Sequence, residues 1–342
     1  MDEFRIGLIG CGGIAHRHIN GYRAIAHDLG TVVAGCDPNS GTLDKFSDQY
    51  ELSHRFSDTK DLIESGEVNV IALLTPPAVR ADVIFPAIEK GIHILIEKPF
   101  AENLADAESF VEAAEQAGTV LAVNQQLRFM PDVIALRDII ESDEIGSPRV
   151  ITHDQFQNRT QFGGWRTEEQ RLEISIFSIH LLDRIRSLMG KSPTAVSTVT
   201  RAWSPFAKGE TLTALTIQFE DECVGTMVSS WHALTQTECR LRIDGTKGSA
   251  QSLKGLVVHD PATLTVHSLN GEPRTIDCFE ENAFVNAMGK SMNHLLHAAR
   301  MGTQPPHNGR DNLETMQIVD AAYLSAERGG ALVTIEEVKN IK

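Results

Sequence analysis

The run Arg-Ile-Gly-Leu-Ile-Gly-Cys-Gly-Gly-Ile-Ala at residues 5–15 constrains the fold more than any other segment of this chain. It places Gly10-x-Gly12-x-x-Ala15 between an apolar, strand-like run and a helical pattern. Gly10 permits a tight turn, Gly12 lets the backbone approach a pyrophosphate, and Ala15 keeps the helix close to the sheet. An ordinary glycine-rich turn is the alternative, but the strand before the motif and the helix after it favour a dinucleotide site. We expect the phosphates to lie at the helix N-terminus, against Gly10, Gly12, Gly13 and Ile14.

A second apolar run ends in Asp37, 27 residues after Gly10. This spacing is close to the roughly 20 residues that separate the first glycine from the ribose-binding acid in dinucleotide folds. A turn-forming Asp before Pro38 is the alternative, and the pairing with the glycines argues against it. Residues 38–42 contain no Arg or Lys that could bind a 2′-phosphate, so the sequence favours NAD over NADP.

The pattern of elements divides the chain into two predicted domains. Within residues 1–124, short apolar runs alternate with helical patterns, which predicts a doubly wound parallel sheet. The strand-like runs cover 5–9, 31–36, 68–74, 92–96 and 120–123, and the helical patterns cover 14–26, 42–50, 79–90 and 105–117.

Residues 125–342 contain mostly strand-like runs, which predicts a second domain built on an antiparallel or mixed sheet. The expected strands are 150–156, 195–202, 212–219, 225–231, 238–243 and 256–259, and the expected helices are 132–141, 173–188, 284–300 and 313–328.

Composition narrows the class of protein further. The formal net charge of −15 disfavours nucleic acid and anionic membranes as partners. The five cysteines are scattered and include no C-x-x-C pair, so we expect neither a disulfide framework nor a structural zinc site. No metal is expected, because the histidines form no ligand spacing. The N-terminus does not read as a signal peptide and no apolar run is long enough to span a membrane, so we expect a cytoplasmic protein.

A candidate catalytic lysine follows the strand at residues 92–96. Glu97-Lys98-Pro99 stands at the carboxyl end of that strand, where doubly wound folds bind their ligands. A lysine there can donate a hydrogen bond to a substrate hydroxyl and stabilise a developing alkoxide. A solvent-exposed turn lysine is the alternative.

These motifs, in this order, resemble the glucose-fructose oxidoreductase / inositol dehydrogenase / MocA family over nearly the whole chain. The shared segments are the glycine motif, Thr75-Pro76, Glu97-Lys98-Pro99, Asn124 to Arg128-Phe129, Trp165-Arg166, His180-x-x-Asp183 and residues 319–326. The resemblance implies a Rossmann domain, an open-faced sheet domain that often supports a homodimer or homotetramer, and a last helix, about 310–328, that can return to the first domain.

The resemblance also implies roles for particular residues. Lys98 would be catalytic, and Trp165 and Arg166 would lie on a loop that closes over cofactor and substrate. The nicotinamide half of NAD would be bordered by Thr75, Pro76, Glu97, Lys98 and Asn124. Substrate contacts are expected at Lys98, Arg128, Gln155, Asn158 and His180, although Gln155 and Asn158 can equally be turn residues.

His180 corresponds to the family's general base, which removes the hydroxyl proton as hydride leaves. Read alone, His180 fits better as a helix histidine that is satisfied by its i+3 neighbour Asp183, but within the matched motif we favour a catalytic role. Many relatives carry an Asp four residues earlier, where this chain has Ile176. Glu173 or Asp183 is the replacement carboxylate that the sequence offers.

The predicted function is therefore NAD-dependent hydride transfer at a hydroxyl or keto carbon of a sugar, cyclitol or related polyol. Two alternatives remain open at this stage. An NAD-dependent glycosidase or eliminase would oxidise the sugar only transiently and would form no net NADH. A non-catalytic NAD-binding sensor would fit the missing Asp at position 176 but not the presence of both Lys98 and His180.

Overall fold

Two compact units make up the chain, as seen in the computed structural model, which describes residues 3–159, 163–255, 260–269 and 271–340. The first unit contains Met1–Phe129 and Phe284–Leu313, and the second contains Met130–Ala283 and Glu314–Lys342. The segment that returns to the first unit is thus 284–313, whereas the sequence suggested the helix near 310–328.

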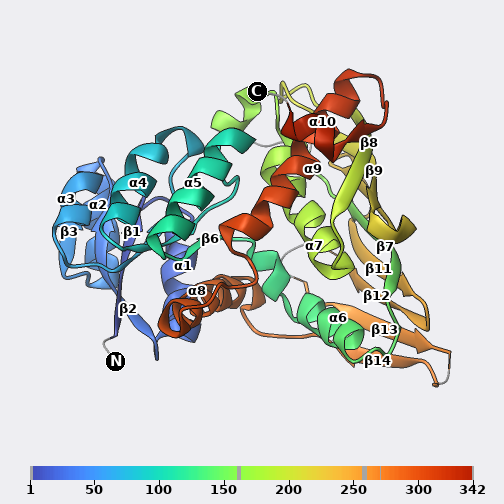
Figure 1. Cartoon of the computed structure of the whole chain (residues 1–342), viewed down its shortest axis with the longest axis horizontal. Coiled ribbons are helices and arrows are strands. Elements are labelled where there is room, and N and C mark those ends of the chain that lie inside the picture. Colours follow the sequence, from blue (N-terminus) through green and yellow to red (C-terminus); the bar gives the residue numbers. More distant parts are fainter. Residues whose placement is uncertain (1–2, 160–162, 256–259, 270, 341–342) are drawn as a thin grey trace. The chain divides into compact units, whose positions relative to one another are not determined.

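The first unit is built on a six-stranded parallel sheet in the order β3-β2-β1-β4-β5-β6 (Figure 1). This is the Rossmann order, and it confirms the predicted doubly wound sheet. The apolar runs of the central strands are buried on both faces, because helices cover both sides of a parallel sheet. The strands are β1 (Phe4–Ile9), β2 (Gly30–Cys36), β3 (His54–Phe56), β4 (Val70–Leu73), β5 (His93–Ile96) and β6 (Leu121–Val123).

Asparagine side chains cap the N-termini of two crossover helices of this unit, α2 and α5. The Asn39 side chain accepts a hydrogen bond from the backbone of Thr42, and Asn103 does the same for Asp106, so each Asn satisfies a free N–H of the first turn. The crossover helices are α1 (Ala15–Gly21), continued by a π-helical turn to Ala26, α2 (Ser40–Tyr50), α3 (Thr59–Glu64), α4 (Ala81–Glu89) and α5 (Leu104–Ala117).

Helix α8 (Ala283–Met301) returns to the first unit because it packs directly on α1. A Cβ added to Gly289 would lie 2.1 Å from the carbonyl oxygen of Gly21, so only glycine allows this approach. Met292, Leu295 and Leu296 are buried in the same apolar core as Ala15 and Ile19 of α1. The two glycines are far apart in the sequence, so no local sequence pattern predicts this helix contact.

The second unit contains a nine-stranded mixed sheet in the order β14-β13-β12-β11-β7-β10-β9-β8-β15. Strands β7 and β10 pair in parallel and the other neighbours pair antiparallel, which confirms the mixed alternative. The strands are β7 (Pro148–Phe156), β8 (Pro193–Arg201), β9 (Leu212–Phe219), β10 (Val224–Ser230), β11 (Glu238–Gly245), β12 (Gly248–Lys254), β13 (Thr263–Ser268), β14 (Arg274–Asp277) and β15 (Val333–Thr334).

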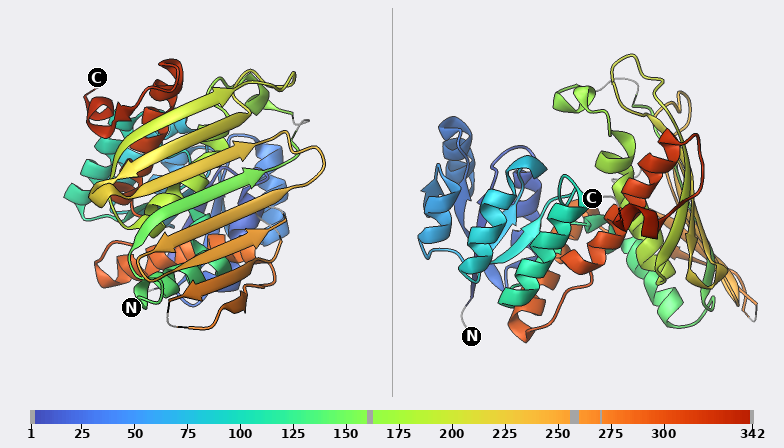
Figure 2. Two further views of the ribbon diagram at one scale, coloured as in Figure 1. Left: turned by 90° about the vertical axis from the view of Figure 1, so that its right-hand side faces the viewer. Right: turned by 45° about the horizontal axis from the view of Figure 1, so that its top comes forward.

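One face of this sheet carries the helices of the second unit, and the other face is open in the left view of Figure 2. Helix α7 (Ile179–Met189) packs against β7 and β10, and it is preceded by a π-helical turn, η5 (Glu173–Ser178). The other helices are α6 (Pro131–Glu141), α9 (Gly309–Glu327) and α10 (Ile335–Lys339). The residues of α9 up to Leu313 belong to the first unit, and those from Glu314 belong to the second.

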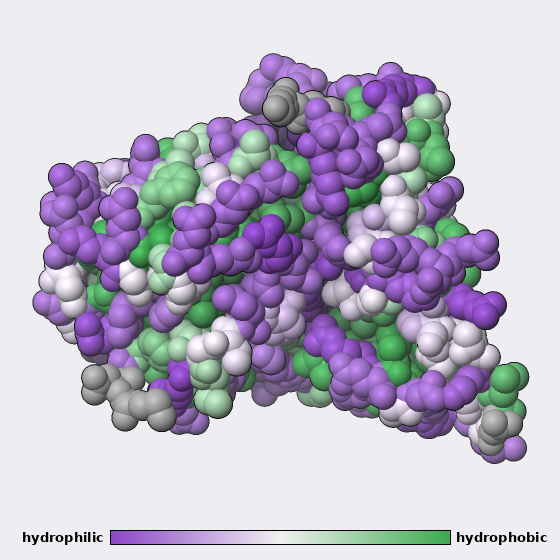
Figure 3. Space-filling view, in the orientation of Figure 1, coloured by the Kyte–Doolittle hydropathy of each residue, from purple (hydrophilic) through white to green (hydrophobic). Residues whose placement is uncertain are grey.

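The short and polar elements are the ones that the sequence pattern did not predict. Strand β12 reads Gly-Ser-Ala-Gln-Ser-Leu-Lys and lacks clear apolar alternation, and β3 has three residues. The strand expected at 256–259 lies outside the described residues. Among the described residues no helix is long and apolar enough to span a bilayer, and the surface in Figure 3 is mostly hydrophilic.

Candidate active site

The glycine loop after β1 has the conformation that the motif requires. Gly10 has φ +94°, and a Cβ there would lie 3.3 Å from the backbone of Leu74, so the position requires glycine. A Cβ added to Gly12 or Gly13 would meet no atom within 4 Å, which leaves open space in front of the loop. Helix α1 begins directly afterwards, at the fully buried Ala15. The loop can therefore receive a pyrophosphate against backbone N–H groups.

Asp37 is tied to this loop at the end of β2. The backbone N–H of Cys11 donates to Oδ2 of Asp37 at 2.9 Å, and the N–H of Asn39 donates to Oδ1 at 2.9 Å. Each carboxylate oxygen can accept a further hydrogen bond from a ribose hydroxyl. The acid and the phosphate loop are thus neighbours, which fits the adenosine half of a dinucleotide.

Glu97 anchors the turn that carries Lys98. The Glu97 carboxylate is buried, with His18 Nε2 at 2.8 Å and the Asn124 amide donating at 2.5 Å to the same oxygen. Burial alone would raise the pKa of Glu97, but His18, the charge of Lys98 and the Asn124 hydrogen bond together outweigh this effect and lower the pKa. Lys98 itself is half-buried directly beyond β5. The charged Glu97 therefore holds the backbone that presents the lysine.

Arg80 connects the Thr75 loop to the Lys98 turn. Its guanidinium is buried, and its Nε and Nη2 donate to the carbonyl of Thr75 at 3.1 and 2.6 Å. Its Nη1 donates to the carbonyls of Pro99 and Phe100. Burial lowers the pKa of Arg80 to about 10, with the nearby Glu97 opposing the shift. The sequence alone does not reveal this role of Arg80, because an Arg near the start of a helix has no distinctive pattern.

Two buried polar atoms near this turn have no hydrogen-bond partner among the described residues: Oγ1 of Thr75 and Oδ1 of Asn124. A native protein rarely leaves such atoms unpaired without a ligand or water to satisfy them. Both residues were expected at the nicotinamide half of the cofactor, with Pro76 exposed beside Thr75. This donor and acceptor set fits a carboxamide.

The second unit carries His180 in the first turn of α7, where it is buried. Ile176, one turn earlier, packs in an apolar cluster with Leu172 and Trp231. Position 176 therefore contributes to the core in this chain and provides no charge to the histidine.

Glu173 is fully buried at the start of the π-helical turn η5. The hydroxyls of Ser178 and Ser229 both donate to its Oε1, the latter at 2.5 Å. Burial raises the pKa of Glu173 to about 7, although these hydrogen bonds oppose the shift. Asp183, the other candidate carboxylate, accepts a hydrogen bond from Thr315 at 3.0 Å and lies 3.7 Å from Arg186. Which carboxylate acts on His180 stays a prediction.

Glu210 fixes the beginning of the same helix, a role that the sequence did not reveal. Its carboxylate accepts from the backbone N–H groups of Leu172 and Ile174 at 3.0 to 3.2 Å and from the Tyr323 hydroxyl at 2.6 Å. Free N–H groups at a helix N-terminus favour a carboxylate. Because Glu210 is far from residues 172–174 in the sequence, no local capping pattern predicts this contact.

The remaining predicted residues lie in different surroundings. Arg128 is buried in the first unit, where it pairs with Asp311 at 2.6 Å and donates to the Pro306 carbonyl. Gln155 lies on the helix-covered face of β7, buried, and Asn158 is exposed. Trp165 and Arg166 lie in a short 3-10 turn at Trp165–Glu168, with Arg166 exposed.

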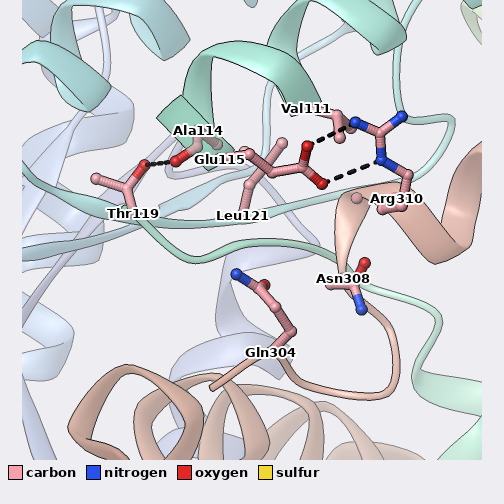
Figure 4. Close-up of a pocket in the computed structure, with 9 residues that line it drawn as sticks. Val111, Ala114, Glu115, Thr119, Leu121, Gln304, Asn308 and Arg310 are labelled. Carbon is pink, nitrogen blue, oxygen red and sulfur yellow. Dashed lines mark hydrogen bonds and ion pairs between the residues drawn. The ribbon is translucent and has the colours of Figure 1, made fainter. Parts of the chain in front are cut away.

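A small pocket elsewhere in the first unit contains none of the predicted site residues (Figure 4). It lies between α5, β6 and the start of α9 and is closed on one side by Glu115, which accepts two hydrogen bonds from Arg310 at 3.0 and 2.6 Å. No cluster of three His, Cys, Asp or Glu side chains suited to a metal occurs among the described residues.

A Rossmann sheet with an open glycine loop and a strand-end acid, joined to a mixed-sheet unit, defines a two-domain dinucleotide-binding protein. This chain belongs to the Gfo/Idh/MocA oxidoreductase family. Residues 4–125 match the oxidoreductase family's NAD-binding Rossmann fold, and residues 137–335 match its C-terminal alpha/beta domain. These matches confirm the resemblance and identify NAD as the cofactor of the first domain.

Relatives cover almost the entire chain. It is 26% identical to D-apiose dehydrogenase of Paraburkholderia graminis, over 96% of this chain and 89% of that protein. It is 25% identical to the scyllo-inositol 2-dehydrogenase (NAD(+)) of Bacillus subtilis, over 96% and 95%. An oxidoreductase from Agrobacterium radiobacter, solved with NAD+, L-tartaric acid and magnesium, has the same fold, with a TM-score of 0.90, 24% identity and coverage of 98% and 99%.

Proposed function

We propose that this protein is an NAD-dependent dehydrogenase that transfers a hydride between nicotinamide and a CH–OH carbon of a sugar, cyclitol or related polyol. The single observation that carries the proposal is the Glu97-anchored turn with Lys98 at the end of β5, beside the unpaired Thr75 and Asn124 atoms. D-apiose and scyllo-inositol, named for two relatives, are both polyhydroxylated, which supports this substrate class.

Lys98 and His180 divide the proton chemistry in this proposal. Lys98 donates a hydrogen bond to the reacting hydroxyl and stabilises the developing alkoxide. His180 accepts the hydroxyl proton as a general base. The bound NAD supplies the hydride acceptor. Gly10, Gly12, Gly13, Ile14 and Asp37 bind its adenosine and phosphate half, and Thr75, Pro76, Glu97 and Asn124 border the other half, with Trp165 and Arg166 covering it.

NAD is preferred over NADP in this proposal. Both carboxylate oxygens of Asp37 are held by backbone N–H groups, so the charge is fixed where it would repel a 2′-phosphate. We also propose Arg128, Gln155 and Asn158 as substrate contacts. Arg128 has a structural role as well, because it forms an ion pair with Asp311.

The test is a panel of sugars, polyols, cyclitols and glycosides incubated with NAD and scored by NADH absorbance. We expect stoichiometric NADH with at least one free polyol or sugar. Product formation without net NADH would replace this proposal with transient oxidation, and NAD binding without any turnover would replace it with a sensor.

A further inference from the structure

Two arginines of the second unit share the ring of one aromatic residue, Phe177. The guanidinium carbon of Arg159 lies 4.5 Å from the ring centroid, and that of Arg166 lies 5.7 Å from it. Arg159 follows β7, and it also lies 5.8 Å from the ring of Trp231. Two segments that are separate in sequence therefore bring two cations to one place.

Arg159 is not neutralised by an acidic neighbour. Its one side-chain hydrogen bond within the described chain runs from Nε to the neutral amide oxygen of Gln157, and no described carboxylate lies within ion-pair distance. Burial lowers the pKa of Arg159, and the charge of Arg166 lowers it further, while Glu173 opposes both effects. Glu173 is a weak counter-ion, because its own pKa is raised to about 7 by burial.

This arginine pair lies beside the helix that carries the proposed base. Phe177 lies in the π-helical turn that leads directly into α7, three residues before His180. Position 176, directly before Phe177, is isoleucine and contributes no charge there. Nearby on β7, Oε1 of the buried Gln155 has no partner among the described residues.

The charge of Arg166 disfavours the charged form of the partly buried Arg159, and a bound anion relieves that repulsion. The planar fork of Arg can bind a carboxylate through two parallel hydrogen bonds, and the aromatic rings limit the orientation of the guanidinium. Gln155 adds an acceptor for a hydroxyl. The set fits a polyhydroxy compound that ends in a carboxylate.

We propose that Arg159 and Arg166 bind a carboxylate of the substrate, so that the enzyme acts on a sugar acid or related polyhydroxy acid in preference to the neutral sugar. This inference rests on the proposed function, because it names the substrate class of the same site.

Steady-state kinetics on matched pairs of substrates tests this proposal. The two members of each pair differ only in that one has a carboxylate where the other has a hydroxymethyl group. We use D-galacturonate with D-galactose and D-gluconate with D-glucitol. For wild type we expect kcat/KM to be roughly 10- to 100-fold higher for the acid, the range of a charge-assisted hydrogen bond. Arg159→Gln and Arg166→Gln should each remove this preference through KM, and Arg159→Gln should leave NAD affinity unchanged. Arg149→Gln removes an exposed charge from the start of β7 and should leave the preference intact.

Binding of D-gluconate and D-glucitol to the NADH-bound enzyme, followed by calorimetry, separates this inference from the proposed function. The reduced cofactor cannot oxidise either probe, and we expect gluconate binding that Arg159→Gln abolishes and Arg159→Lys retains in part. Gluconate binding without NADH formation from any compound would sustain the carboxylate site and defeat the proposed function. NADH formed equally from acid and neutral partners, a preference that survives both Gln variants, or a preference for sugar phosphates would overturn the carboxylate assignment.

Discussion

Arg80 is the residue whose structural role is clearest from its contacts, because one buried guanidinium binds the carbonyls of Thr75, Pro99 and Phe100. We predict that Arg80→Leu lowers the free energy of unfolding by about 2–4 kcal/mol, because several charge-assisted hydrogen bonds are lost. It should also reduce kcat, because the turn of Lys98 loses its connection to the Thr75 loop.

Arg80→Lys keeps the charge but cannot span all three carbonyls, so an intermediate loss is expected. Lys45→Leu, an exposed charge removal on α2, is the control and should change stability by under about 0.5 kcal/mol. Urea unfolding and steady-state kinetics measure both effects. Wild-type stability and turnover in Arg80→Leu would show that the hydrogen bonds of Arg80 to these three carbonyls have no role.

We propose that Asp37 is the single residue that makes the protein prefer NAD over NADP. We predict that wild type binds NAD at least roughly tenfold more tightly than NADP, a difference of about 1.4 kcal/mol. Asp37→Ala should narrow that ratio, because the repulsion of a 2′-phosphate disappears together with the ribose hydrogen bonds. Fluorescence titration with both reduced cofactors measures the ratio, and equal affinities in wild type would refute the prediction.

Among single residues, those in short motifs could be predicted from sequence and those acting over long range could not. Gly10 and Asp37 belong to a motif with a recognisable spacing along the chain. In the folded protein the backbone N–H of Cys11, next to Gly10, donates a hydrogen bond to Asp37. Arg80 and Glu210 act through carbonyls or N–H groups contributed by other segments. Their function is visible only when the chain is folded.

At the scale of elements, the helix formed by η5 and α7 combines a buried acid with a carboxylate cap. Burial raises the pKa of Glu173 to about 7 from an ordinary value near 4.5, so the folded state binds a proton that the unfolded state releases between these values. Stability should therefore fall as pH rises from about 4.5 to about 7, by up to about 3 kcal/mol, and then remain level with respect to this group.

We predict that Glu173→Gln removes this part of the pH dependence and is relatively more stable at pH 8 than at pH 4. Denaturant unfolding of both proteins across this pH range gives the comparison. An unchanged slope in the variant would mean that the Glu173 carboxyl does not carry the raised pKa.

Elements with strong apolar periodicity were predicted well, and the six-stranded parallel sheet follows from them. Strand β12 is mostly polar, and β3, β14 and β15 contain only two to four residues each, so they carry little periodic signal. Strand β13 alternates apolar and polar residues, but it was not predicted. The return of α8 to the first unit depends on the contact of Gly21 with Gly289, which no local pattern encodes.

At the scale of the whole molecule, the open face of the nine-stranded sheet is a surface on which copies of the chain can associate. We predict a homodimer or homotetramer, in line with the exposed Val150, Val199 and Leu253 on its strands. Light scattering coupled to size exclusion measures the mass directly. A monomer at micromolar concentration would contradict this prediction.

We propose that this chain oxidises a polyol carbon with Lys98 and His180 as its proton-handling groups. The most direct measurement compares NADH formation by wild type, Lys98→Ala and His180→Ala on one substrate, with NAD affinity determined in parallel. The account predicts that each variant binds NAD as wild type does but loses roughly 10²- to 10⁴-fold in rate. It also predicts that the rise of the wild-type rate with pH vanishes in His180→Ala and persists in Glu173→Gln. Full turnover by either alanine variant, with an unchanged pH profile, would contradict it.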